Sequence, residues 1–208
     1  MKSLKIAFSF VLALSLAAFS LKEDPSAGYK AGDKATDFKL KNINDKEVSL
    51  ADYKDAKGFI VVFTCNHCPY AKAYESRIMA LDKQYAGKGY PVIAISPNDP
   101  VAEPADSFEN MQKLAKQKGY SFPYLLDETQ DITRAYGAKA TPHVFVLQKT
   151  AAGNVVKYIG AIDDDTENTK ADKVKYVESA VNALLSGKQP QTTATKAIGC
   201  SIKWKKSA

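Results

Sequence analysis

The sequence predicts an α/β fold with a mixed central sheet flanked by helices. Two apolar runs, 59–63 and 92–95, have the length and the β-branched content of buried strands, and a segment of helical periodicity separates them. Strand, helix and strand in this order predict a parallel crossover. Downstream, two further runs, 144–147 and 155–162, flank a turn at Gly153-Asn154, which predicts an antiparallel pair.

The N-terminal elements are predicted to be a hairpin and a helix. Residues 32–40 and 48–50 are expected to form an entry hairpin, as the family resemblance described below implies. The first helix is expected to begin at Pro69 and to end before Gly87. Its apolar positions recur at helical spacing: Tyr70, Tyr74, Ile78, Leu81 and Tyr85.

Three more helices are predicted after the second strand. The first has Asp106 or Ser107 as its N-cap and ends at Gly119, with Phe108, Met111, Leu114 and Ala115 on one face. A short strand over 123–127 precedes a short helix that ends at Gly137. The last helix is predicted to carry Val174, Val177, Val181, Leu184 and Leu185 and to end at Gly187.

The domain organisation is read from composition. A chain of 208 residues with 45% hydrophobic residues fits one domain with a sizeable core. We expect a signal peptide over 1–20, a linker over 21–31, the folded domain over 32–187, and a C-terminal tail over 188–208 that carries Cys200.

The N-terminus predicts export. Lys2 and Lys5 precede an apolar stretch, 6–18, and Ala18-Phe19-Ser20 is a small-x-small cleavage site. The stretch is shorter than the roughly 20 residues that span a bilayer, so we expect a periplasmic or otherwise exported protein with no membrane span after cleavage. The lysines behind the net charge of +6 are scattered, which argues against nucleic-acid binding.

The chemistry is expected at the junction between the first buried strand and the first helix. There Cys65 and Cys68 are separated by two residues, a spacing that serves either a redox disulfide or a metal site. The strand before and the helix after favour redox chemistry. A helix start and the neighbouring His67 both stabilise an anion, so the pKa of Cys65 is predicted to lie below its free value of about 8.5.

This stretch resembles the Cys-x-x-Cys motif of the thioredoxin fold, and His67 before Cys68 is similar to the Cys-Pro-His-Cys motif of periplasmic disulfide oxidants. From about Gly32 to Trp204 the chain resembles the redoxin (alkyl hydroperoxide reductase/thiol-specific antioxidant) branch. Within it, a peroxiredoxin-like subgroup carries Cys-Asn-His-Cys-Pro-Tyr and Gly-Cys-Ser-Ile-Lys-Trp-Lys, which stand here at 65–70 and 199–205. The resemblance implies a thioredoxin-like fold with a redox-active disulfide centre.

The resemblance also implies a second half of the site. In thioredoxin-fold proteins a cis-proline opens the strand that faces the cysteine pair, and Thr141-Pro142 matches that position. We expect the backbone beside Pro142 to align a substrate chain across the sulfur. Thr64 and His143 are accessory candidates, because each adjoins one of these two segments.

Cys200, the third cysteine, lies beyond the last helix. One interpretation is a resolving thiol that attacks a mixed disulfide at Cys65. The other is a buried spectator in a tail that packs through Ile202 and Trp204.

Three functions are compatible with these residues. The leading one is a thiol-disulfide oxidoreductase that acts on protein disulfides or dithiols with an unidentified electron donor: Cys65 attacks and Cys68 resolves. It requires no cofactor and no metal. The second is a peroxidase with Cys65 peroxidatic, for which only Arg77 and Arg134 are available as the activating arginine. The third is a copper or zinc protein that uses Cys65, Cys68, His67 and His143, as copper-delivery proteins of the Sco type use cysteines and a histidine on this fold.

Overall fold

A computed structural model describes residues 28–206, so the predicted signal peptide and most of the predicted linker lie outside the described part. One sheet of eight strands forms its centre, in the order β1-β9-β8-β4-β5-β6-β2-β3. The strands are β1 (Lys34–Ala35), β2 (Leu40–Asn42), β3 (Glu47–Val48), β4 (Gly58–Phe63), β5 (Val92–Ser96), β6 (Tyr124–Leu126), β8 (His143–Thr150) and β9 (Gly153–Gly160). Strands β4, β5 and β6 run parallel and the others antiparallel, which confirms the mixed sheet.

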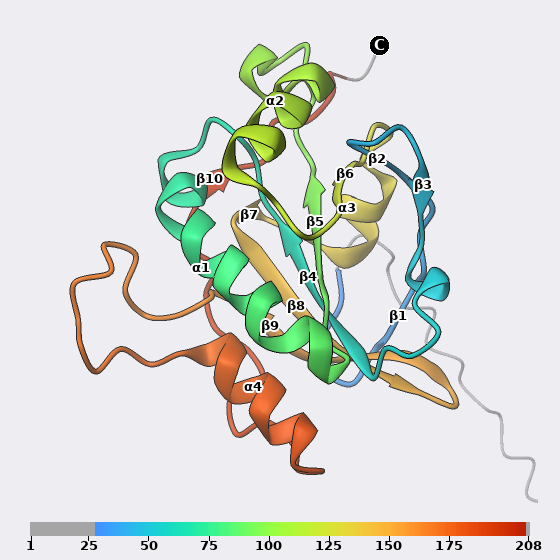
Figure 1. Ribbon diagram of the computed structural model, residues 1–208, viewed down its shortest axis with the longest axis vertical. Helices are drawn as coiled ribbons and strands as arrows, with labels where there is room; N and C mark the ends of the chain where they lie inside the picture. The colour runs from blue at the N-terminus through green and yellow to red at the C-terminus, as the bar shows by residue number, and fades with distance from the viewer. Residues whose placement is uncertain (1–27, 207–208) are drawn as a thin grey trace, which may run out of the picture.

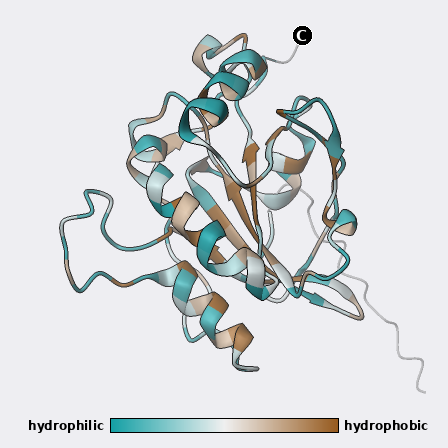
Figure 2. Ribbon diagram, viewed as in Figure 1, coloured by the Kyte–Doolittle hydropathy of each residue, from teal (hydrophilic) through white to brown (hydrophobic). Residues whose placement is uncertain are grey.

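Helices lie on both faces of this sheet (Figure 1). They are α1 (Pro69–Tyr85), α2 (Phe108–Lys118), α3 (Asp131–Tyr136) and α4 (Tyr176–Leu185), with short 3-10 turns at η2 (Leu50–Asp52), η3 (Ala86–Lys88) and η4 (Pro104–Asp106). Figure 2 shows apolar strands at the centre and polar helix surfaces outside them. The buried strands are thus shielded from water on both sides, as parallel strands require.

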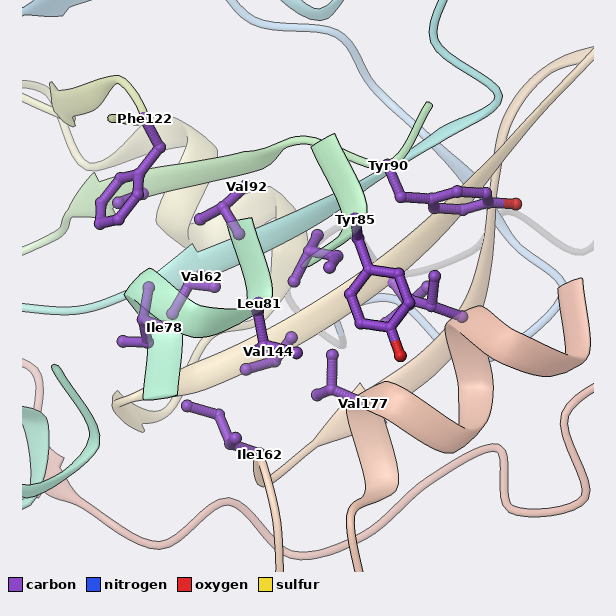
Figure 3. Close-up of a cluster of buried hydrophobic side chains, with 14 of the residues drawn as sticks. Val62, Ile78, Leu81, Tyr85, Tyr90, Val92, Phe122, Val144, Ile162 and Val177 are labelled. Carbon is purple, nitrogen blue, oxygen red and sulfur yellow. The ribbon is translucent and has the colours of Figure 1, made fainter. Parts of the chain in front are cut away.

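One core lies between the sheet and the helices α1 and α4. Val62, Val92 and Val144 project from three neighbouring strands toward Leu81 of α1 and Val177 of α4 (Figure 3). The helical spacing predicted for α1 therefore describes its buried face, with one exception: Tyr70 is exposed, and its neighbour Ala71 is the buried residue of the first turn.

The second core lies on the opposite face, beneath α3 and the tail. Phe63, Tyr136 and Phe145 form an aromatic group there, and Ile202 from the tail joins the same cluster. The tail also forms β10 (Cys200–Ser201), which pairs with β7 (Ala140–Thr141) as a separate two-stranded sheet. The tail is therefore packed on the body of the protein.

Some element boundaries differ from the prediction. The entry hairpin holds only between β2 and β3, because β1 pairs with β9 at the far edge of the sheet. Helix α4 begins at Tyr176, so Val174 precedes it and is half exposed. Of the two N-cap residues predicted for α2, Asp106 and Ser107, Ser107 is confirmed: its hydroxyl accepts a hydrogen bond from the Asn110 N–H. Among residues 28–206, no helix has both the length and the apolar character needed to cross a bilayer.

Candidate active site

The loop between β4 and α1 carries Cys65, His67 and Cys68. Strand β4 ends at Phe63, and Cys68 is the N-cap residue of α1, with Pro69 as the first helical residue. Cys68, and not Cys65, is therefore the cysteine at the helix start. Its side chain is fully buried, whereas the predicted nucleophile Cys65 lies three residues earlier and is 5% exposed.

Asp106 fixes the conformation of this loop. Its Oδ1 accepts hydrogen bonds from the backbone N–H groups of Asn66 and His67, at 2.8 and 3.0 Å. Its Oδ2 lies 2.6 Å from His67 Nδ1 and accepts a hydrogen bond from Asn98 Nδ2 at the same distance. The sequence indicated Asp106 only as a possible helix cap, because no local pattern shows that its carboxylate reaches a loop forty residues upstream.

The Cys65 thiol is held among polar partners in a buried place. Its Sγ shares a hydrogen bond of 3.1 Å with Thr141 Oγ1 and lies 3.7 Å from His67 Nδ1. Burial, with a smaller contribution from the negative charge of Asp106, raises the pKa of Cys65 to about 11. Hydrogen bonds from Thr141 and from backbone amides act in the opposite direction but do not compensate.

The prediction of a lowered Cys65 pKa was therefore wrong for this state of the protein. The prediction assumed that the helix start and an imidazolium would dominate. In the structure Cys65 lies outside the helix, the nearest carboxylate opposes ionisation, and burial is the largest effect. As it stands, Cys65 is a protonated thiol at neutral pH.

The Thr141-Pro142 segment faces the cysteines. The peptide bond between these residues is cis, which confirms the prediction for this position. Thr141 contacts two of the cysteines, since its hydroxyl bonds to Cys65 Sγ and its carbonyl oxygen lies 3.2 Å from Cys68 Sγ. Thr64, predicted as an accessory residue, lies on the other side of Cys65 and lines a small cavity beside it.

The disulfide in the structure joins Cys68 to Cys200, across 132 residues of sequence and with 6.0 Å between the Cα atoms. The predicted pair was Cys65 and Cys68, so this bond is a correction. It forms because β10 lies opposite Thr141 and presents Cys200 to Cys68, while the Cys65 sulfur is engaged by Thr141. All three cysteines still form one cluster, packed with Ala71. Cys200 is therefore no spectator, although its partner is Cys68 rather than Cys65.

His143 lies elsewhere. Its Nδ1 accepts a hydrogen bond from the backbone N–H of Lys139, and its ring packs against Phe145. It lines a cavity of about 480 Å³ between α3, β8 and the tail. Burial lowers the pKa of His143 to about 4, with a further contribution from the charge of Lys139. His143 is thus a neutral imidazole that does not join His67 at the cysteines.

The two other functions considered from the sequence find less support here. Arg77 is bound to the Asp163 carboxylate at 2.7 Å and Arg134 lies over the Trp204 ring, so both candidate activating arginines are engaged elsewhere. The proposed metal ligands Cys68 and His143 are likewise engaged. In the described part of the chain, donor atoms of Cys65, His67 and Asp106 do lie within 4.8 Å of one another, but Asp106 is already an acceptor of four hydrogen bonds.

Comparison with known proteins agrees with this picture. The sequence pattern of the AhpC/TSA family matches residues 31–159, more than half of the chain. The chain belongs to the AhpC/TSA family. The thiol-disulfide oxidoreductase ResA of Geobacillus thermodenitrificans is 27% identical over 151 residues, which cover 71% of this chain and 76% of that protein. This AhpC/TSA protein is accordingly an oxidoreductase.

Two solved structures show how far the fold is shared. A hypothetical protein from Sinorhizobium meliloti 1021 is 34% identical and has a TM-score of 0.79, over 86% of this chain and 97% of that one. Peroxidoxin BcpB from Mycobacterium tuberculosis is 18% identical with a TM-score of 0.51, over 62% of this chain and 84% of that one, and shows the fold alone. The AhpC/TSA protein has the thioredoxin-like fold that was predicted.

Proposed function

We propose that the protein is an exported thiol-disulfide oxidoreductase that exchanges disulfides with protein substrates through Cys65, Cys68 and Cys200. The observation that carries the proposal is the cluster of these three sulfurs, with one pair bonded and one thiol free beside it. A purely structural disulfide needs no third cysteine buried against it. The likeness to ResA supports the same class of reaction.

The cycle starts from the protein with all three thiols reduced. The Cys65 thiolate attacks a substrate disulfide, so that one S–S bond forms to the substrate and one substrate thiolate leaves. Cys68 then attacks Cys65 Sγ, which closes a Cys65–Cys68 bond and releases the second substrate thiol. Cys200 finally attacks Cys68 Sγ, which regenerates the Cys65 thiol and gives the bond seen in the structure.

Each step exchanges one S–S bond for another, and the cycle is completed by an external dithiol that reduces Cys68–Cys200. Two electrons and two protons then pass from that dithiol to the pair. All steps are reversible, so the potentials of substrate and donor set the direction. The start of α1 favours Cys68 as the leaving thiolate, because helix N–H groups stabilise an anion there.

The other site residues act on Cys65. Thr141 donates or accepts the hydrogen bond that positions the sulfur. His67 is the imidazole nearest to the thiol, and its Nδ1, which donates to the Asp106 carboxylate, already carries a proton, so its role is to stabilise the Cys65 thiolate rather than to accept the proton of the thiol. Pro142 and Thr141 form the edge along which a substrate chain is expected to lie.

The experiment follows reduction of a protein disulfide, with insulin as the substrate and dithiothreitol as the donor. We expect Cys65→Ser to abolish turnover, Cys68→Ser to accumulate a mixed disulfide at Cys65, and Cys200→Ser to leave a Cys65–Cys68 bond. Turnover that survives Cys65→Ser would refute the assignment. Peroxide consumption is measured in parallel, since peroxide turnover that needs Cys65 and Cys200 but not Cys68 would favour the peroxidase.

Export rests on the sequence of residues 1–20 alone. Expression of the full chain in a bacterium with a periplasm tests it: the mature protein recovered from the periplasm should lack these residues. Recovery of the unprocessed chain from the cytoplasm would contradict export without affecting the redox assignment.

A further inference from the structure

The tail crosses the site as a strap fastened at both ends. We use the name strap for residues 196–201. Before it, Thr195 Oγ1 accepts a hydrogen bond from the Ala161 N–H and bonds to the Tyr158 hydroxyl. After it, Ile202 is buried in the core on the far face of the sheet. The Gln130 side chain holds the next residues, donating to the Lys203 carbonyl and accepting from the Lys205 N–H.

The strap lies against β7 (Ala140–Thr141), the short strand that the cysteines face, and the side of β7 that it covers is called the edge below. Cys200 pairs with Thr141 and Ser201 with Ala140, in an antiparallel register. Thr141 is also the residue whose hydroxyl engages the Cys65 sulfur. The strap therefore occupies a strand position directly beside the buried thiol, and Cys200 packs on the cluster that contains it.

Gly199 makes this close approach possible. A Cβ atom at this position would lie 2.2 Å from the Thr141 carbonyl oxygen and 3.1 Å from the Pro142 nitrogen. Both are backbone atoms, so neither can rotate out of the way. Any other residue before Cys200 would push the strap off the edge, which makes glycine followed by cysteine the sequence that fits.

We propose that the strap is a resident occupant of this edge, fastened by Cys68–Cys200, and that reduction of this bond opens the edge to an extended partner segment in which glycine precedes cysteine. The proposal rests on the proposed function and adds to it a substrate class and a control of access. Strand addition to a free edge supplies backbone hydrogen bonds, and the space beside the edge selects the side chains.

The opening step is an ordinary thiol-disulfide exchange. A thiolate of an external dithiol attacks Cys200 Sγ, which is the less buried sulfur of the pair, and Cys68 leaves as a thiolate. The second thiol of the donor then attacks the first donor sulfur, which is bonded to Cys200 in the mixed disulfide, and Cys200 leaves as a thiolate. The donor is oxidised to a disulfide, and the strap is left without its covalent fastening.

The first test measures how fast iodoacetamide alkylates Cys65, resolved from Cys68 by fragmentation of the shared peptide. We expect the rate in the reduced wild type to exceed that in the oxidised wild type by at least tenfold. Gly199→Ala should give the fast rate without reductant. Gly87→Ala is the matched control, because a Cβ there meets nothing within 4 Å, and it should behave as the wild type.

Equal alkylation rates in oxidised and reduced wild type would overturn the proposal. Should Gly199→Ala not fold, hydrogen exchange on the wild type provides a second readout. The Ser201 and Ala140 amides should exchange faster after reduction, and unchanged exchange would count equally against the strap.

The second test addresses the partner segment. A peptide with the sequence of residues 197–202, its cysteine activated as a thionitrobenzoate disulfide, is offered to reduced Cys200→Ser protein. We expect it to react with the protein at least tenfold faster than the same peptide with alanine in place of glycine. Both peptides should react equally with glutathione, which controls for intrinsic reactivity. Equal rates with the protein would refute the selection of glycine.

These outcomes separate the two proposals. Unmasking of Cys65 on reduction, without turnover of any protein disulfide, would leave the strap standing and refute the oxidoreductase cycle. Turnover of a protein disulfide with no change in Cys65 accessibility on reduction would support the oxidoreductase cycle and refute the strap.

Discussion

Asp106 has two opposed roles at the scale of single residues. It holds the Asn66 and His67 amides in place, and its charge opposes ionisation of the neighbouring Cys65. A site built only for a reactive thiolate would have no carboxylate in this position. The arrangement fits a thiol that stays inactive until its surroundings change.

Asp106→Asn should therefore lower the pKa of Cys65 from about 11, because the charge is removed while an oxygen remains to accept the loop amides. The measurement is the pH dependence of Cys65 alkylation in the oxidised protein, where this is the free cysteine. Glu103→Gln is the control: it removes a carboxylate 3.7 Å from His67 Nε2 and should leave the midpoint near pH 11. A midpoint that rises or stays constant in Asp106→Asn would contradict this account.

His143 links stability to pH. Its pKa is about 4 in the folded protein and 6.5 when unperturbed, so between these values the unfolded chain binds the extra proton. The contribution is fully present above pH 6.5 and is lost as the pH falls toward 4, by about 3 kcal/mol in the free energy of unfolding. Urea denaturation at pH 7 and pH 4.5 should show a smaller loss in His143→Phe than in wild type. An equal loss would mean that His143 is protonated in the folded protein.

The sequence located most residues of the site but not their electrostatics. Cys65, Cys68, His67 and Thr141 do meet, because the strand-loop-helix pattern and the Thr141-Pro142 pair are local signals. The raised Cys65 pKa was not predictable, since it depends on burial in the folded protein and on a carboxylate from a distant 3-10 turn.

The tail strand is the least predictable element. Strands β4 and β5 could be placed from continuous apolar runs, whereas β10 has two residues and no periodicity. Next to it, Ile202 is buried in the same core cluster as Phe63 and Tyr136, which holds the tail on the body of the protein. Likewise, β1 pairs with β9 rather than within the entry hairpin, a choice that depends on the edge available in the complete sheet.

Ile202→Ala tests whether the tail is part of the folded body. We expect a loss of about 2–5 kcal/mol in the free energy of unfolding, as for other buried isoleucines. Val101→Ala is the control, since Val101 is 86% exposed and its truncation should change stability by less than about 0.5 kcal/mol. Urea denaturation measures both. Near-equal effects would show that the tail is only loosely attached.

At the scale of the whole molecule, Cys68–Cys200 ties the tail to the first helix across 132 residues. Such a cross-link restricts the unfolded chain, so its reduction should lower the free energy of unfolding by about 2–5 kcal/mol. Urea denaturation with and without dithiothreitol measures this, and Cys200→Ser should reproduce the reduced value. Cys65→Ser leaves the cross-link intact and should remain sensitive to dithiothreitol. Identical curves for oxidised and reduced protein would contradict the prediction.

The overall architecture could be predicted from the sequence, whereas the pairing of the cysteines in the disulfide could not. The parallel crossover and the helices on both faces follow from the order of periodic segments along the chain. Which two of three cysteines bond depends on where residue 200 arrives in space, and a spacing of 132 residues contains no information on that.

The anchors at Thr195 and Ile202 determine how readily the strap closes again after Cys68–Cys200 has been reduced. Because both hold when the covalent link opens, Cys200 stays within reach of Cys68, at an effective concentration on the order of millimolar or above. An incoming segment therefore competes for the edge with a strap that is still anchored at both of its ends. The open form closes again when a substrate disulfide takes up the two electrons of the thiols, so the protein returns to its closed state through the exchange reaction itself.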